Sequence, residues 1–103
     1  MTPEKEVQNK IIKYLKELRK KGYPCYVERR QAGGYSYRMG IADLYAVYNG
    51  IHIEIEVKAP GKLMGPMQEK WKKECEDLNI IHIVADNVED VKNFFKKLIV
   101  YFK

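Results

Sequence analysis

The sequence has little of what marks secreted, membrane-spanning or thiolate-ligated proteins. It contains only two cysteines, Cys25 and Cys75, whose spacing fits no cysteine metal site. We expect two reduced, partly buried thiols rather than a disulfide. No apolar run approaches the roughly 18 residues that span a bilayer, and the charged N-terminus lacks the apolar stretch of a signal peptide. Repeats, low-complexity tracts and linkers are absent, so we expect one cytoplasmic domain over residues 1–103, away from membranes.

Acidic residues are fewer than basic ones. The chain has 14 Asp and Glu against 19 Lys and Arg, which gives a net charge of +5 and a pI near 9.1. If several of these acids gather at one site, the remaining surface is still more basic. The balance favours a polyanionic partner such as nucleic acid, without proving one.

Hydrophobic periodicity and turn residues predict the element order α-β-β-β-α-β-α. The first helix has Thr2 as its N-cap and Pro3 at its start. A helix between the third and fourth strands implies one parallel pair inside a mixed sheet. The expected helices cover 3–20, 67–78 and 88–102, and the expected strands cover 23–30, 41–48, 51–58 and 80–84.

Three finer details follow from the same patterns. The apolar strand 80–84 is typical of an interior strand. Asp86 and Glu89 resemble a capping box for the last helix. The second helix is expected to bury one face, formed by Met67, Trp71, Cys75 and Leu78.

The most informative local feature is a predicted hairpin with Asn49-Gly50 as its two-residue turn. In that register Tyr48 pairs with Ile51, and Asp43 lies opposite Glu56. Opposed residues have Cβ atoms about 5 Å apart, so two carboxylates there repel each other unless a counter-ion joins them. A hard divalent cation would satisfy both. Lys58 projects from the same strand face as Glu56.

The strand that carries Glu56 alternates strictly between apolar and polar residues. The odd positions 51–57 are apolar and predict the core face. The even positions, His52 to Lys58, fit an ordinary solvated face equally well on periodicity alone. Asp43 opposite Glu56 argues against that interpretation, because an exposed pair would sooner place Lys against Glu.

Glu4 and Glu6 in the first helix have different expected positions. Glu4 extends the apolar stripe of that helix, whereas Glu6 lies on the opposite, solvated face. An inward-pointing glutamate should therefore be Glu4. The alternative is that Glu4 only favours the positive end of the helix dipole, and periodicity leaves the two interpretations evenly balanced.

The segment after the first strand interleaves aromatic and basic residues, which is typical of DNA contacts. For any single residue an ordinary solvated loop is an equally good interpretation. A basic connector also precedes the second helix. The candidate DNA-binding residues are Arg29, Arg30, Tyr35, Tyr37, Arg38 and Lys62.

Taken together, these motifs resemble the virus-type replication-repair nuclease domain (VRR-NUC) of the PD-(D/E)xK superfamily, in its small stand-alone form. The matching pieces span residues 4–84: Glu4-Lys5-Glu6-Val7-Gln8, Gly40-Ile41-Ala42-Asp43, Glu56-Val57-Lys58, and Gln68. Glu-x-Lys alone is a weak signal, but the four pieces in order are a strong one. Ala42 departs from the family, which usually has Pro before the Asp, at a position without a catalytic group.

The resemblance implies a restriction-endonuclease-like or Holliday-junction-resolvase-like α/β fold and a Mg²⁺- or Mn²⁺-dependent endonuclease. Asp43, Glu56 and the carbonyl of Val57 would be metal ligands, and Glu4 an outer or second-metal ligand. Lys58 would position or deprotonate the attacking water, and Gln68 would orient Lys58 or the water. It further suggests branched or double-stranded DNA as substrate, a homodimer, and a bacterial or phage-infected host cell.

Two rival functions remain open on the sequence. The first is a non-catalytic DNA-binding module on a nuclease scaffold, which the presence of Asp43, Glu56 and Lys58 together opposes. The second is a basic α/β interaction protein whose motif is coincidental. Undiminished DNA binding on mutation of the three candidate arginines would favour that second function.

Overall fold

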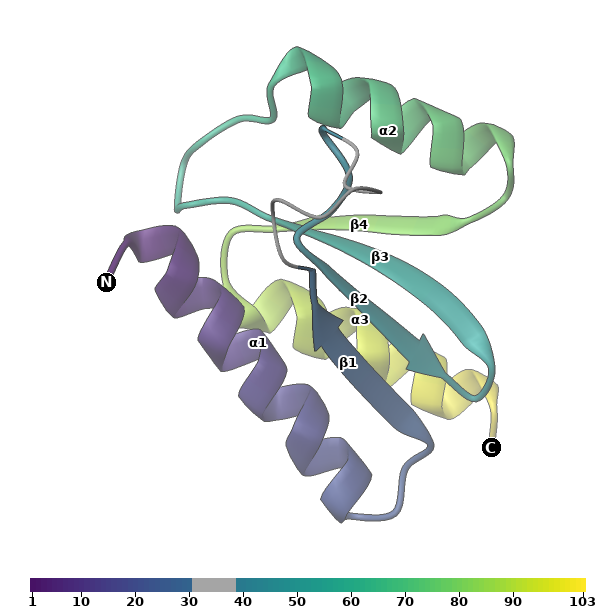
Figure 1. Cartoon of the computed structure of the whole chain (residues 1–103). Helices are drawn as coiled ribbons and strands as arrows, with labels where there is room; N and C mark the ends of the chain where they lie inside the picture. The colour runs from purple at the N-terminus through teal and green to yellow at the C-terminus, as the bar shows by residue number, and fades with distance from the viewer. Residues whose placement is uncertain (31–38) are drawn as a thin grey trace.

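The computed structural model describes residues 1–30 and 39–103 and has the predicted element order (Figure 1). Three candidate DNA-binding residues, Tyr35, Tyr37 and Arg38, lie outside the described residues. The elements are α1 (Pro3–Lys20), β1 (Cys25–Arg29), β2 (Leu44–Tyr48), β3 (Ile51–Val57), α2 (Pro66–Asp77), β4 (Ile81–Ala85) and α3 (Val88–Tyr101). Among the described residues, no helix is long and apolar enough to cross a membrane.

The four strands form one mixed sheet in the order β1-β2-β3-β4. The first two pairings are antiparallel, and β3 pairs with β4 in parallel, as the helix crossover predicted. Asn49 and Gly50 have φ of 49° and 83°, the positive values that a two-residue hairpin turn requires. Tyr48 pairs with Ile51 and Leu44 with Ile55. The predicted register is therefore confirmed.

The two faces of the sheet are covered by different helices. α1 and α3 cover the apolar face, where Ile11 and Phe95 meet Ile53 and Ile55 in a core that excludes water. Each fully buried Ile or Phe stabilises the fold by roughly 1.5–3 kcal/mol. α2 lies across the sheet from those two helices (Figure 1). The N-terminus of α1 is fixed by Thr2, whose hydroxyl accepts a hydrogen bond from the Lys5 amide at 3.2 Å.

The structure corrects the predicted buried face of α2. Of its four expected members only Cys75 is fully buried, Trp71 is half-buried, and Met67 and Leu78 are exposed. The sheet beneath α2 presents a polar side chain, Glu54, rather than an apolar surface. A short helix over that surface has little apolar area to cover. Both cysteines are buried and neither forms a disulfide, in agreement with the expected reduced thiols.

Two further details of the prediction were wrong. β4 is an edge strand, and its Ile81 and Ile83 are only half-buried. It is apolar because α2 and α3 both pack against it. The N-cap of α3 is Asn87, whose side chain accepts from the Asp90 amide at 2.9 Å. Asp86 instead accepts from the amide of Gly61 at 3.3 Å.

Gly40 joins the segment before β2 to the start of α2, and its replacement tests that contact. It has a φ of +87°, and a Cβ there would lie 2.4 Å from the carbonyl oxygen of Met67. We expect Gly40→Ala to lower the unfolding free energy by about 2 kcal/mol or more, because both strain and steric overlap act. Urea unfolding of Gly61→Ala is the control, since Gly61 has a φ of +79° but open space around it. Equal losses in the two variants would contradict the proposed close contact.

Candidate active site

Asp43 lies directly before β2, where the hairpin ladder ends. Its carboxylate oxygen Oδ2 accepts a hydrogen bond from the Val57 amide at 3.3 Å, and its carbonyl accepts from the Arg30 amide at 2.9 Å. The chain is thus held from β1 on one side and from β3 on the other. The hairpin register places this carboxylate beside Glu56, as predicted.

Glu56 is buried beside Asp43. Its side chain is 1% exposed, and among the described residues no N–H group donates to either carboxylate oxygen; the group that faces them is the carboxyl of Asp43. Burial, followed by the neighbouring Asp43, raises the pKa of Glu56 to about 9; Lys58 acts in the opposite direction. A buried carboxylate without donors is costly unless a proton or a cation compensates its charge.

Glu4 joins this group from the first turn of α1. Its side chain is half-buried, while Glu6 is exposed. Burial and then the Asp43 carboxylate raise the pKa of Glu4, and Lys58 lowers it. Glu4 is thus close enough to Asp43 and Lys58 for their charges to affect its pKa, which favours the inward-pointing interpretation that periodicity left open.

Lys58 and Gln68 are in direct contact. The Lys58 ammonium group donates to Oε1 of Gln68 at 3.2 Å. The same oxygen accepts from the Gly65 amide at 2.9 Å, which fixes the side chain at the start of α2. Lys58 itself is anchored by its amide, which donates to the carbonyl of Ala85 in β4 at 2.9 Å. The structure therefore brings together Glu4, Asp43, Glu56, Lys58 and Gln68.

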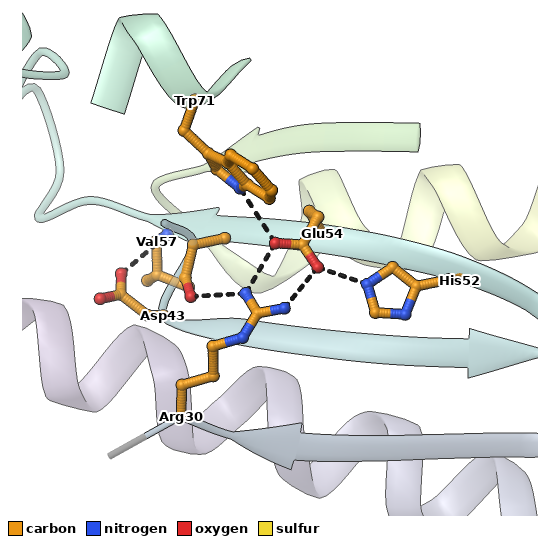
Figure 2. Close-up of polar contacts among 7 residues, drawn as sticks. Arg30, Asp43, His52, Glu54, Val57 and Trp71 are labelled. Carbon is orange, nitrogen blue, oxygen red and sulfur yellow. Dashed lines mark hydrogen bonds and ion pairs between the residues drawn. The ribbon is translucent and has the colours of Figure 1, made fainter. Parts of the chain in front are cut away.

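Sequence analysis missed the buried ion pair beside this group. Glu54 is 1% exposed. Each of its two carboxylate oxygens accepts a hydrogen bond from a terminal nitrogen of Arg30, both at 2.6 Å (Figure 2). Trp71 donates to it at 3.0 Å, and His52 also contacts it. Burial raises the pKa of Glu54, but these hydrogen bonds outweigh burial and lower it. One feature of the sequence could have revealed this ion pair. The helix that joins β3 to β4 has to cover part of the face of β3 that carries the even-numbered residues.

The two arginines proposed to bind DNA make contacts within the protein. Arg29 donates to Gln8 at 3.1 Å and to Asn9 at 2.6 Å. Arg30 is directed toward Glu54. Lys62 is exposed on the connector after Lys58. DNA binding by these residues stays a prediction.

The carboxylate oxygens gathered here are of the chemical type that a hard divalent cation prefers. No group of three His, Cys, Asp or Glu side chains in residues 1–30 and 39–103 is already arranged around a metal position. Mg²⁺ needs no such cage, because it keeps several waters and takes one or two carboxylates. The oxygens of buried Glu56, beside Asp43, are the ligands that such an ion would satisfy.

The chain has a mixed α/β fold with carboxylates gathered at the end of a hairpin. It was compared with protein families, curated proteins and solved structures. No family model and no curated protein matches the sequence. A solved structure described as a VRR_NUC domain has a TM-score of 0.76 to this chain. It covers 93% of this chain and 97% of that one, at 19% identity. At this identity the likeness shows the fold alone: this chain has the fold of that VRR_NUC domain, as the resemblance predicted.

The raised pKa of Glu56 predicts a pH-dependent stability of the metal-free protein. Its folded-state pKa of about 9 exceeds the ordinary 4.5, so between these values the folded protein binds more protons than the unfolded chain. The contribution of Glu56 to the unfolding free energy is therefore full below pH 4.5 and is lost as the pH rises through 9. We expect the unfolding free energy to fall by at least about 1 kcal/mol between pH 5 and 8.5.

Urea unfolding in EDTA at the two pH values measures this loss. Glu56→Gln should flatten the pH dependence and stabilise the protein at pH 8.5, while Glu6→Gln should behave as the parent. A parent-like slope in Glu56→Gln would contradict the assignment.

Proposed function

We propose that the protein is a metal-dependent DNA endonuclease that hydrolyses phosphodiester bonds. One observation supports this most: the buried Glu56 carboxylate accepts no hydrogen bond from an N–H group of the described residues and faces the carboxyl group of Asp43, with Lys58 two residues further on. A protein that needed only stability would have little reason to keep two carboxylates there, because the arrangement is costly. The nuclease-type fold of the VRR_NUC domain is consistent with the proposal.

In this proposal each residue of the group has a distinct task. Asp43, Glu56 and the carbonyl of Val57 would hold Mg²⁺ or Mn²⁺, with Glu4 as an outer ligand. When bound, the cation supplies neutralising charge for the phosphate and lowers the pKa of water. Lys58 would position the attacking water or take its proton, and would steady the charge that develops on the phosphate. Gln68, which already contacts Lys58 at 3.2 Å, would hold its ammonium group in place.

The substrate class we propose is branched or double-stranded DNA recognised by backbone and shape. A chain of 103 residues has little room for a separate base-reading element. Its net charge of +5 favours phosphate contacts. Lys62 is exposed on the connector that follows Lys58, next to the proposed active site. It is therefore a candidate phosphate contact.

Cleavage of a labelled four-way junction and its matching linear duplex, with Mg²⁺, Mn²⁺ or EDTA, tests this function. We expect metal-dependent cutting that Asp43→Asn abolishes. Lys58→Ala should slow it by about 10²–10⁴-fold, the range for a lost acid–base group. Tight DNA binding without cutting in either metal would instead support a non-catalytic module.

Two glutamates in the first turn of α1 provide a matched pair for the same assay. Glu4→Gln should slow cutting by about tenfold or more, because it removes an outer ligand of the site. Glu6→Gln removes the same charge from the same helical turn but from its exposed side, and should leave the rate unchanged. Equal rates in the two variants would remove Glu4 from the proposed site.

A homodimer would place two such sites in one particle, which suits cutting both strands of a junction. The end of α3 supports this arrangement, since Val100 and Tyr101 are exposed apolar side chains beside partly exposed Phe102. We expect sedimentation equilibrium at micromolar concentration to give twice the 12.1 kDa chain mass. Val100→Lys should shift the protein toward monomer, and a parent that is monomeric throughout would contradict the dimer.

A further inference from the structure

Arg30 contacts the chain on both sides of Asp43. Its backbone amide donates to the carbonyl of Asp43 at 2.9 Å. Its guanidinium donates to the carbonyl of Ala42, the residue before, at 3.0 Å. One residue at the end of β1 thus fixes two consecutive carbonyls of the segment that carries the Asp43 carboxylate.

The guanidinium of Arg30 is itself held from several directions. Both of its terminal nitrogens bind Glu54 at 2.6 Å (Figure 2). The guanidinium carbon also lies 5.1 Å from the centre of the Tyr45 ring. Glu54 is fixed in turn by Trp71 of α2 and by His52. The side chain of Arg30 is only 22% exposed. A planar guanidinium group held by these contacts has one orientation available.

We propose that Arg30 is the positioning residue of Asp43. Braced by Glu54, its guanidinium holds the peptide before Asp43 so that the carboxylate stays within reach of the Val57 amide and of Glu56. This inference rests on the proposed function for its catalytic meaning. It gives Arg30 a role different from the DNA contact that the sequence suggested.

A purely structural role does not account for this arrangement. Buried ion pairs add little stability compared with apolar side chains of similar size. The bond from Arg30 to the Ala42 carbonyl, however, is one that no apolar side chain can make. A variant that keeps the packing but lacks the guanidinium group of Arg30 separates the structural role from the positioning role.

The double variant Arg30→Met with Glu54→Met is designed for this purpose. It removes both charges together and leaves neither unpaired, so the fold should be retained. Amide hydrogen exchange in the metal-free protein then reports on Asp43 through its partner, the Val57 amide. We expect exchange at Val57 to become about tenfold faster. The adjacent Lys58 amide, which donates to Ala85, should keep its parent rate.

Two further variants calibrate the measurement. Asp43→Ala sets the full effect of losing the carboxylate at Val57. Arg30→Lys keeps a positive charge beside Glu54 but loses the fork, and it should accelerate Val57 exchange even if the double variant fails to fold. Glu28→Gln is the control: Glu28 lies on the same strand and face, and its partners are the hydroxyl groups of Tyr26 and Tyr45. It should leave Val57 exchange unchanged.

Manganese titration and cleavage complete the test. We expect the double variant to bind Mn²⁺ about 10–100-fold more weakly than the parent, with kcat reduced and the KM for DNA unchanged. A folded double variant with parent-like Val57 exchange would overturn the positioning role. If the parent binds Mn²⁺ without cutting DNA, the proposed function fails, while faster Val57 exchange in the variant still supports the positioning role.

Discussion

Two carboxyl groups held side by side are the constraint around which this structure is organised. The hairpin turn at Asn49 and Gly50 sets the register, and the register leaves Asp43 and Glu56 no choice of neighbour. Burial, followed by their repulsion when both are ionised, raises the pKa of Glu56, while the apolar face beneath holds β2 and β3 together. The strain at one end of the sheet is therefore sustained by burial elsewhere, which is how folded proteins keep costly groups at functional sites.

The three helices contact different parts of the sheet whose end carries Asp43 and Glu56. α1 and α3 cover the apolar face, and α1 also delivers Glu4. α2 brings Gln68 and Trp71, one turn apart, to two different partners: Gln68 contacts Lys58, and Trp71 contacts Glu54. The group that would meet a metal and the ion pair beside it are thus tied to the same helix. A shift of α2 would disturb both at once.

Sequence patterns predicted the parts of this molecule that depend on local chemistry. The hairpin follows from a turn that needs positive φ, whereas helical periodicity separated Glu4 from Glu6 but left the inward position of Glu4 undecided. The errors arose where neighbours distant in sequence decide the outcome. An apolar strand indicates burial but cannot distinguish a central strand from an edge flanked by helices, as β4 shows. Sequence analysis gave Glu54 no partner, because Arg30 directly follows β1 and Trp71 comes from α2.

Glu4 differs from the other acids of the group in how firmly its backbone is held. Asp43 and Glu56 are carried by the sheet, whereas Glu4 stands in the first turn of a helix, where hydrogen bonds are fewest and fraying begins. The cap at Thr2 and the rigid ring of Pro3 oppose that fraying. Unwinding of a single turn would withdraw one carboxylate and leave the other two in place. The negative charge of the site is thereby coupled to a local helix–coil equilibrium, with its own dependence on temperature.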